Sequence, residues 1–162
     1  MPKTYSTSND HDATPEKVLA TLTDPEFLVE REKAQGAIDA RVQEIKRSDK
    51  ELVLRLHATE YGRTMTGGLD KSKQEKSTTV YEWNLETMKG EWTYEGTHGK
   101  RIQVSGSFRV TPREEGGSRV ASHFHVKVDI PLIGGKIEKM VIKEIEKSTP
   151  VSAAVLRRFL SV

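Results

Sequence analysis

The side chains with the clearest chemical potential are two histidines spaced two residues apart. His123 and His125 lie in a segment of alternating polar and apolar residues, so both point to one face of a strand, and two imidazoles so placed can begin a metal site. That face also carries Lys127 and Asp129 and lies opposite the apolar side chains, and a third ligand would have to come from a distant residue such as His57. We therefore expect solvated histidines and no bound metal.

Motifs of the common enzyme classes are missing. The chain has no Gly-x-Ser-x-Gly, His-Glu-x-x-His or Gly-x-Gly-x-x-Gly sequence and no cysteine, so hydrolase, zinc-protease, dinucleotide and thiol chemistry have no motif support. Gly134-Gly135 could cradle a phosphate before a helix, but a lone glycine pair is more typical of a tight turn. Glu144 could accept a proton inside a cavity, although its charged neighbours favour a solvated helix face. The sequence identifies no catalytic residue and no cofactor, which favours a protein that is not an enzyme.

Large aromatic residues gather in two neighbouring segments. Tyr81 and Trp83, and then Trp92 and Tyr94, are two residues apart, so each pair shares one face of its strand. If both pairs face inward, they form an aromatic surface suited to an apolar ring or chain with a polar group. An ordinary sheet core is the alternative for any one of them, but their grouping favours a lined hollow.

Periodicity predicts the elements that position these residues. An edge strand is expected at 3–11, followed by two short helices that begin at Thr14-Pro15 and Asp24-Pro25, each a cap residue followed by proline. Alternating apolar and polar residues predict a hairpin of strands at 37–43 and 52–59, and further strands at 77–85, 90–95, 101–111 and 118–130. Residues 62–76 contain three glycines and have no period, so we expect a long mobile loop with Met65 and Leu69 at its tip.

The C-terminal segment is predicted to form a long amphipathic helix. Apolar residues recur at three and four positions from Ile137 to Phe159, and Pro150 should bend the helix or restart it at Thr149. A twisted sheet that is apolar on one face needs a cover, and this helix alone is long enough to provide it. The predicted fold class is α+β: a curved antiparallel sheet of about seven strands around the long helix, with two short helices after the first strand, in one domain over residues 1–162.

Composition limits the partners. Charged residues are 31% of the chain and hydrophobic residues 35%, while the formal net charge is only +2, too small for a field that would attract nucleic acid. No apolar run approaches the roughly 18 residues that a membrane span needs, and the N-terminus lacks an apolar signal segment. We expect a soluble cytoplasmic protein that does not bind nucleic acid.

The junction between the last strand and the helix resembles that of a known family. The sequence Val126-Lys127-Val128-Asp129-Ile130-Pro131-Leu132-Ile133-Gly134-Gly135-Lys136-Ile137-Glu138 is similar to the DUF2505 family of unknown function, part of the START-like or SRPBCC superfamily with polyketide cyclases, Bet v 1 allergens and lipid-transfer domains. Glu82-Trp83 and Gly106 fall where similar members place a Trp and a Gly. The resemblance implies a helix-grip fold that holds a ligand, with no assigned reaction. Pro150 departs from it, because this helix usually runs unbroken in relatives.

We expect the protein to bind or transport a hydrophobic or amphipathic molecule, lipid-like or aromatic, in a cavity between sheet and helix. The expected cavity residues are Leu54, Leu56, Tyr81, Trp83, Trp92, Tyr94, Phe108, Phe124, Ile137, Met140 and Val141, with the two tryptophans nearer the rim. Met140 is expected to be buried against the sheet. Lys136, Lys139, Lys143 and Lys147 form a basic stripe that either contacts anionic lipid transiently or solubilises the helix. Two alternatives stay open: a cyclase- or hydratase-type enzyme, marked by inward-facing acids or histidines, and an interaction module with a collapsed cavity.

Overall fold

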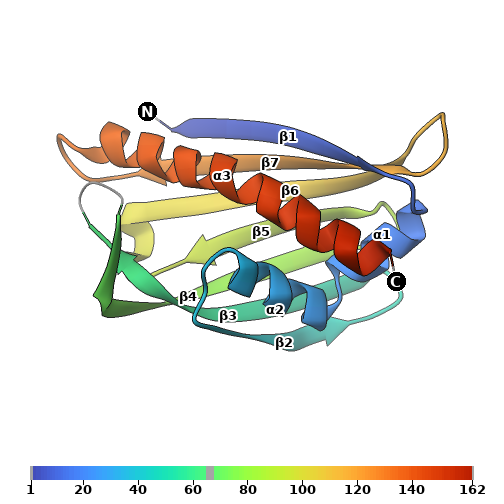
Figure 1. The fold of residues 1–162 in the computed structure, drawn as a ribbon, viewed down its shortest axis with the longest axis horizontal. Helices are drawn as coiled ribbons and strands as arrows, with labels where there is room; N and C mark the ends of the chain where they lie inside the picture. The colour runs from blue at the N-terminus through green and yellow to red at the C-terminus, as the bar shows by residue number, and fades with distance from the viewer. Residues whose placement is uncertain (1, 65–67, 162) are drawn as a thin grey trace.

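The computed structural model describes residues 2–64 and 68–161, and these form a curved sheet with helices on its concave side (Figure 1). In chain order the elements are β1 (Lys3–His11), α1 (Pro15–Leu22), α2 (Pro25–Ala34), β2 (Asp39–Arg47), β3 (Glu51–Arg63), β4 (Leu69–Asn84), β5 (Lys89–Glu95), a turn of 3₁₀ helix η1 (Gly99–Arg101), β6 (Ile102–Pro112), β7 (Ser118–Val128) and α3 (Gly134–Leu160). The sheet has the strand order β1-β7-β6-β5-β4-β3-β2, with every neighbouring pair antiparallel. The α+β helix-grip prediction is confirmed.

The two short helices begin where their cap residues predict. The Thr14 side chain accepts a hydrogen bond from the Lys17 N–H at 3.2 Å, and the Asp24 carboxylate accepts one from the Glu26 N–H at 3.0 Å. Each bond satisfies an N–H group that has no partner within the helix. The buried faces of α1 and α2 join the hydrophobic core with the C-terminal half of α3. The core consists of Val18, Leu19, Leu22, Phe27, Leu28, Leu52, Leu54, Leu56, Tyr81, Trp83, Val110, Val120, Val155 and Leu156.

The long loop predicted over residues 62–76 is wrong. Strand β3 continues to Arg63 and β4 begins at Leu69, and their extended hairpin pairs Glu60 with Glu75 and, after a bulge, Gly62 with Asp70. The extension is polar on both faces, so it lacks the apolar alternation by which a half-buried strand is recognised. Leu69 is exposed, and Met65, expected at the tip, lies outside the described residues.

Helix α3 runs through Pro150 without a restart at Thr149, which was one of the two alternatives. Proline has no N–H to donate to the carbonyl four residues earlier, which here belongs to Glu146. The Thr149 hydroxyl donates to that carbonyl at 3.1 Å, and the Ser148 hydroxyl donates to the Ile145 carbonyl at 2.9 Å. The Thr149 hydroxyl therefore replaces the missing backbone donor at the Glu146 carbonyl, and the helix continues.

A buried carboxylate ties the start of α3 to the end of β7. Glu138 is 1% exposed, and its Oε2 accepts a hydrogen bond from the Val128 N–H at 2.9 Å. The chain between them turns through Leu132, which has a φ of 71° and a fully exposed side chain. Within the described residues, no helix contains a stretch long and apolar enough to cross a bilayer.

Candidate functional site

A cavity of about 1410 Å³ lies between the concave face of the sheet and α3, where its lining runs from Lys136 to Leu156. The curved sheet is wider than one helix, so α3 alone does not cover its concave face (Figure 1). Helices α1 and α2 pack against only the part of that face near the C-terminal half of α3. The cavity exceeds the roughly 300–1,000 Å³ typical of small-molecule sites. This volume contradicts the alternative of a collapsed cavity.

Most of the residues expected at the cavity do line it. These are Tyr81, Trp92, Tyr94, Phe108, Phe124, Ile137, Met140 and Val141. Met140 is only half-buried, because the cavity separates it from the sheet against which it was expected to pack.

Leu54, Leu56 and Trp83 do not line the cavity. All three are at most 3% exposed and belong to the core cluster, where α1 and α2 cover the sheet. The Trp83 ring lies over Gly90 and stacks on Phe108 with ring centroids 5.9 Å apart, so Trp83 is not near the rim. The alternation of residues gives the face of a strand correctly, but it does not tell which part of that face a helix fills.

The remaining aromatic residues form one continuous surface inside the cavity. The Phe108 ring lies between Tyr81, stacked at 6.5 Å, and Trp92, tilted at 6.4 Å, and Trp92 meets Phe124 edge-on at 5.7 Å. Gly106 makes this arrangement possible, since a Cβ there would meet the Trp92 ring and the His123 carbonyl oxygen. The aromatic surface provides flat contacts for an apolar ligand.

A buried arginine stands where the cavity meets the core. The Arg31 side chain is 8% exposed, and its Nη2 donates a hydrogen bond to the Tyr81 hydroxyl at 2.6 Å. The guanidinium lies over the rings of Phe27 and Tyr81, at 5.5 and 5.7 Å from their centroids, and 3.8 Å from the Glu32 carboxylate. Burial raises the pKa of the Tyr81 hydroxyl. Sequence reasoning missed Arg31 within a charged stretch, although its place four residues after Phe27 puts it on the buried face of α2.

A second polar group spans three neighbouring strands on the cavity wall. Ser77 Oγ of β4 donates to Glu60 Oε1 of β3 at 3.4 Å, and Tyr94 of β5 lies next to them. Burial raises the pKa of Glu60, and burial with the nearby Glu60 charge raises the pKa of Tyr94 to about 12. Burial also raises the pKa of Glu32, against the opposing effect of Arg31. In β3 the even-numbered residues from Leu52 to Ala58 face the concave side, and Glu60 is the next even-numbered residue. This alternation could have predicted that Glu60 faces the cavity.

Two histidines, His11 and His98, line the cavity. His11, at the end of β1, is 5% exposed, and burial together with the nearby Arg157 charge lowers its pKa. The histidines considered from the sequence, His57, His123 and His125, do not line the cavity. The imidazole of His11 adds a polar group to the cavity wall near the C-terminal half of α3.

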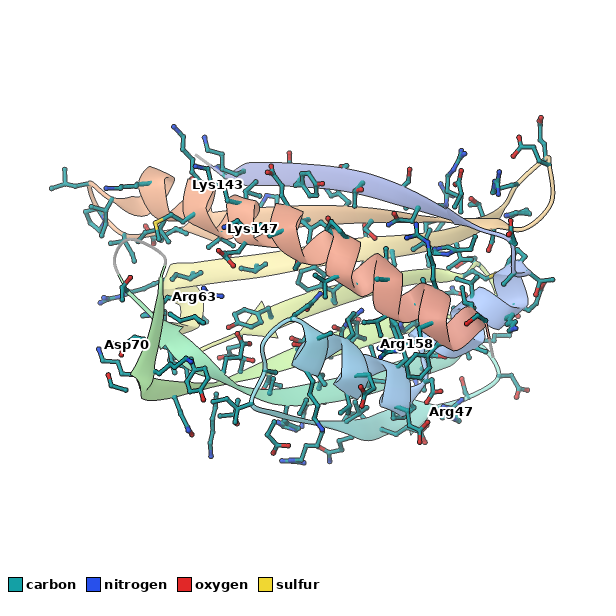
Figure 2. All side chains as sticks on the ribbon, viewed as in Figure 1. Arg47, Arg63, Asp70, Lys143, Lys147 and Arg158 are labelled. Atoms are coloured by element: carbon teal, nitrogen blue, oxygen red, sulfur yellow. The ribbon has the colours of Figure 1, made fainter. Side chains whose placement is uncertain are left out.

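An ion pair joins β3 to α3 at a solvent-exposed part of the cavity wall, here called the cavity mouth. Arg63 Nη2 at the end of β3 lies 3.3 Å from Glu144 Oε2 on α3, and Lys147 lies 3.8 Å from the other oxygen of the same carboxylate. In Figure 2, Arg63 lies below α3, with Lys143 and Lys147 on the helix above it. Lys136, Lys143 and Lys147 line the cavity, whereas Lys139 is exposed away from it. Glu144 is half-exposed and ion-paired, which fits the solvated alternative better than a proton acceptor inside the cavity.

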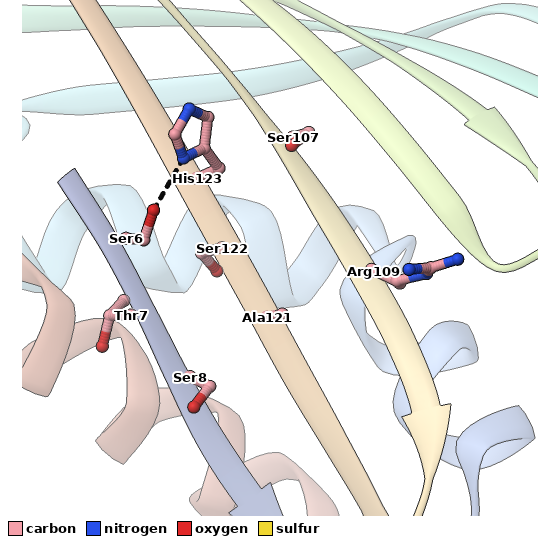
Figure 3. A pocket seen from close by; sticks show the side chains of 8 residues that line it. All are labelled: Ser6, Thr7, Ser8, Ser107, Arg109, Ala121, Ser122 and His123. Atoms are coloured by element: carbon pink, nitrogen blue, oxygen red, sulfur yellow. Dashed lines mark hydrogen bonds between the residues drawn. The ribbon is translucent and has the colours of Figure 1, made fainter. Parts of the chain in front are cut away.

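The paired histidines lie on the outer face, as predicted. His123 and His125 are exposed, and the His123 Nδ1 lies 2.7 Å from Ser6 Oγ at a depression of about 420 Å³ on the convex side (Figure 3). Among the described residues, no group of three or more His, Asp or Glu side chains is arranged to hold a metal ion.

Several solved structures share this fold over nearly the whole chain. A Thermus thermophilus protein superposes with a TM-score of 0.65 at 18% identity, covering 97% of this chain and 96% of that one. The ZhuI aromatase/cyclase of Streptomyces sp. R1128 gives 0.65 at 13% identity, covering 98% and 94%. A START superfamily protein of Mycobacterium smegmatis gives 0.57 at 12% identity, covering 95% and 94%. At these identities the likeness shows the fold alone.

Sequence comparison gives the family. No curated protein matches the chain. The family model described as "Protein of unknown function (DUF2505)" matches residues 6–160, from within β1 to the end of α3. The chain therefore belongs to the DUF2505 family, on a START-like helix-grip fold.

Proposed function

We propose that the protein binds and carries a hydrophobic or amphipathic small molecule, lipid-like or aromatic, in the cavity beneath α3. The observation that supports this most is the cavity of about 1410 Å³, whose wall combines an aromatic surface with polar and charged side chains. Such a wall favours an apolar body and fixes the position of a polar group. The START-like neighbours support the proposal at the level of the fold.

Native mass spectrometry of the freshly purified protein, together with displacement of the fluorophore 1-anilinonaphthalene-8-sulfonate, tests this proposal. We expect a copurified molecule, or saturable displacement by members of a panel of fatty acids, sterols and flavonoids. Met140→Trp, which fills part of the cavity, should weaken the binding without unfolding the protein. Ile45→Trp is a control on an exposed position of β2, outside the cavity. No copurified molecule and no saturable displacement would contradict the proposal.

A cyclase- or hydratase-type enzyme is the second candidate, favoured by the inward-facing carboxyl groups. Burial raises the pKa of Glu60 and Glu32, and a carboxyl with a raised pKa is a better proton acceptor near neutral pH. Hydrogen–deuterium exchange at the carbon next to the carbonyl of 1-tetralone, whose uncatalysed exchange is slow at neutral pH, followed by NMR, tests this chemistry. A rate above background that Glu60→Gln abolishes would support an enzyme, and a background rate would contradict it.

The basic stripe supports a transient contact with an anionic membrane. Its four lysines are exposed along α3, and the turn before the helix presents the exposed side chains of Leu132 and Ile133. Lysines attract anionic headgroups, and an apolar tip can enter the interface. Co-sedimentation with vesicles containing phosphatidylserine should exceed that with phosphatidylcholine, and should fall with added salt and in the double variant Lys139→Gln with Leu132→Ser. Equal sedimentation with both lipids would contradict this contact.

A further inference from the structure

We propose that Arg31 and Tyr81 bind an uncharged oxygen of the ligand, such as a ketone or phenol oxygen, and thereby fix its orientation in the cavity. This inference rests on the proposed binding function and names the ligand class. Both side chains line the cavity at its border with the core.

The two side chains have hydrogen-bond donors to spare. An arginine has five N–H donors, and the one side-chain hydrogen bond that Arg31 forms within the described residues is the bond to the Tyr81 hydroxyl. Tyr81 is 5% exposed and accepts this bond, so its own O–H proton remains available, and no described residue accepts it. Both side chains line the cavity, so a ligand oxygen placed there can accept hydrogen bonds from both groups.

The guanidinium is held in place before any ligand binds. It lies over the Phe27 ring on its own helix and over the Tyr81 ring on β4, and its side chain is nine-tenths buried. Little side-chain entropy is then lost when a ligand binds, because the donor is already oriented. These contacts make the pair a site for one particular ligand atom rather than a mobile surface charge.

The surrounding charges favour an uncharged oxygen over a carboxylate. Glu32 lies 3.8 Å from Arg31 and compensates its charge, and Glu60 lines the same cavity. A carboxylate ligand would bring a further negative charge next to these two side chains. A carbonyl or phenol oxygen gains the hydrogen bonds without that repulsion.

The ring next to Tyr81 indicates the shape of the ligand beyond the oxygen. Phe108 stacks on Tyr81 with an interplanar angle of 12°, and the aromatic surface continues through Trp92 to Phe124. A flat ring bound to the oxygen would lie along this surface. The ligand class is therefore an aromatic ketone or a phenol.

Three matched probes test this inference: 2-acetylnaphthalene, 2-ethylnaphthalene, which lacks the oxygen, and 2-naphthoate, which carries a carboxylate. Their affinities are measured at pH 7 by displacement of 1-anilinonaphthalene-8-sulfonate from the full chain. We expect the acetyl compound to bind about tenfold more tightly than the ethyl compound, as one hydrogen bond to a charged donor allows, and more tightly than the naphthoate. Tyr81→Phe and Arg31→Met should bring the acetyl-to-ethyl ratio close to one.

Tyr61→Phe is the matched control, because it removes a hydroxyl from a ring outside the cavity, beneath Lys71, and should keep the ratio. Circular dichroism shows which variants are folded, and Tyr81→Phe, the smaller change, decides the result if Arg31→Met is unfolded. A wild-type ratio near one, a ratio that survives Tyr81→Phe, an equal loss in Tyr61→Phe, or tightest binding of the naphthoate would each overturn the inference. Binding of the ethyl compound in those cases would leave the proposed function standing, whereas binding of no probe contradicts the proposed function itself.

Discussion

Gly106 is the residue on which the aromatic surface of the cavity depends most directly. A Cβ at this position would lie 2.6 Å from the Trp92 ring, and closer still to the backbone oxygen of His123. Gly106→Ala should therefore lower the free energy of unfolding by about 1–3 kcal/mol, because neither the ring nor the backbone can move freely. Gly135→Ala is the matched control, since a Cβ there meets nothing within 4 Å, and it should be neutral or stabilising by up to about 1 kcal/mol. Urea denaturation measures both, and equal effects would show that the close contact is unimportant.

Glu60 should make the stability of the protein depend on pH. Its pKa is raised by burial, so the folded state disfavours the ionised carboxylate. The resulting loss in the free energy of unfolding is absent below the ordinary pKa of a glutamate and is complete above the raised pKa of Glu60. Glu60→Gln should increase the melting temperature at neutral pH, and the gain should disappear as the pH falls through the raised pKa towards about 4.5. Glu91→Gln, at an exposed position of β5, should show no such trend. A gain of equal size at all pH values would contradict the role of burial.

The sequence makes some of the polar residues in the cavity predictable and hides others. Glu60 follows the period of two that makes Leu52 to Ala58 face inward, so its inward position can be read from the strand pattern. Only the spacing of Arg31 from Phe27 indicates that Arg31 is buried, because its charged neighbours Glu30 and Lys33 are typical of a solvent-exposed segment. The hydrogen bond of Arg31 to Tyr81 joins residues that are 50 positions apart, and no local pattern contains that information.

At the scale of the element, Pro150 tests how α3 tolerates a proline. The Thr149 hydroxyl already donates a hydrogen bond to the Glu146 carbonyl. Pro150→Ala should add the backbone hydrogen bond from residue 150 to the same carbonyl. The expected gain in the free energy of unfolding is about 1–3 kcal/mol, up to the full cost of a proline inside a helix. Thr149→Val should destabilise the wild-type protein, but should have less effect in the Pro150→Ala background. Thermal unfolding of the four proteins measures this coupling, and strictly additive effects would contradict it.

The extended β3–β4 hairpin shows why one element was not predictable from its residues. Strand prediction depends on one apolar face, and the residues from Asp70 to Lys76 are polar on both faces. Backbone hydrogen bonds to β3 hold this part of β4 in the sheet, and these bonds leave no mark on the sequence. Strands β2, β5, β6 and β7 carry an apolar or aromatic face, and β1 is rich in Thr, Ser and Tyr, so their boundaries could be read to within a few residues.

At the scale of the whole molecule, the order of elements was sufficient for the fold but not for the position of the cavity. One long helix that follows an antiparallel sheet in the chain predicts that the sheet curves around that helix. The residues Leu54, Leu56 and Trp83 have the same inward pattern as the cavity residues, yet α1 and α2 cover them. Where the short helices pack is a tertiary property, and it divides the concave face into a filled half and a hollow half.

The ion pair at the cavity mouth connects the architecture to the kinetics of binding. Arg63 and Glu144 join β3 to α3 across the mouth, and both are about 45% exposed, so Glu144→Gln should change the free energy of unfolding by less than about 1 kcal/mol. If the pair limits the opening of the mouth, stopped-flow mixing with 1-anilinonaphthalene-8-sulfonate should show faster association and faster dissociation in Glu144→Gln, with a nearly unchanged Kd. Glu51→Gln, which breaks an exposed pair with Lys46 away from the cavity, should change neither rate. Unchanged rates in both variants would show that ligands pass the mouth without the pair having to open.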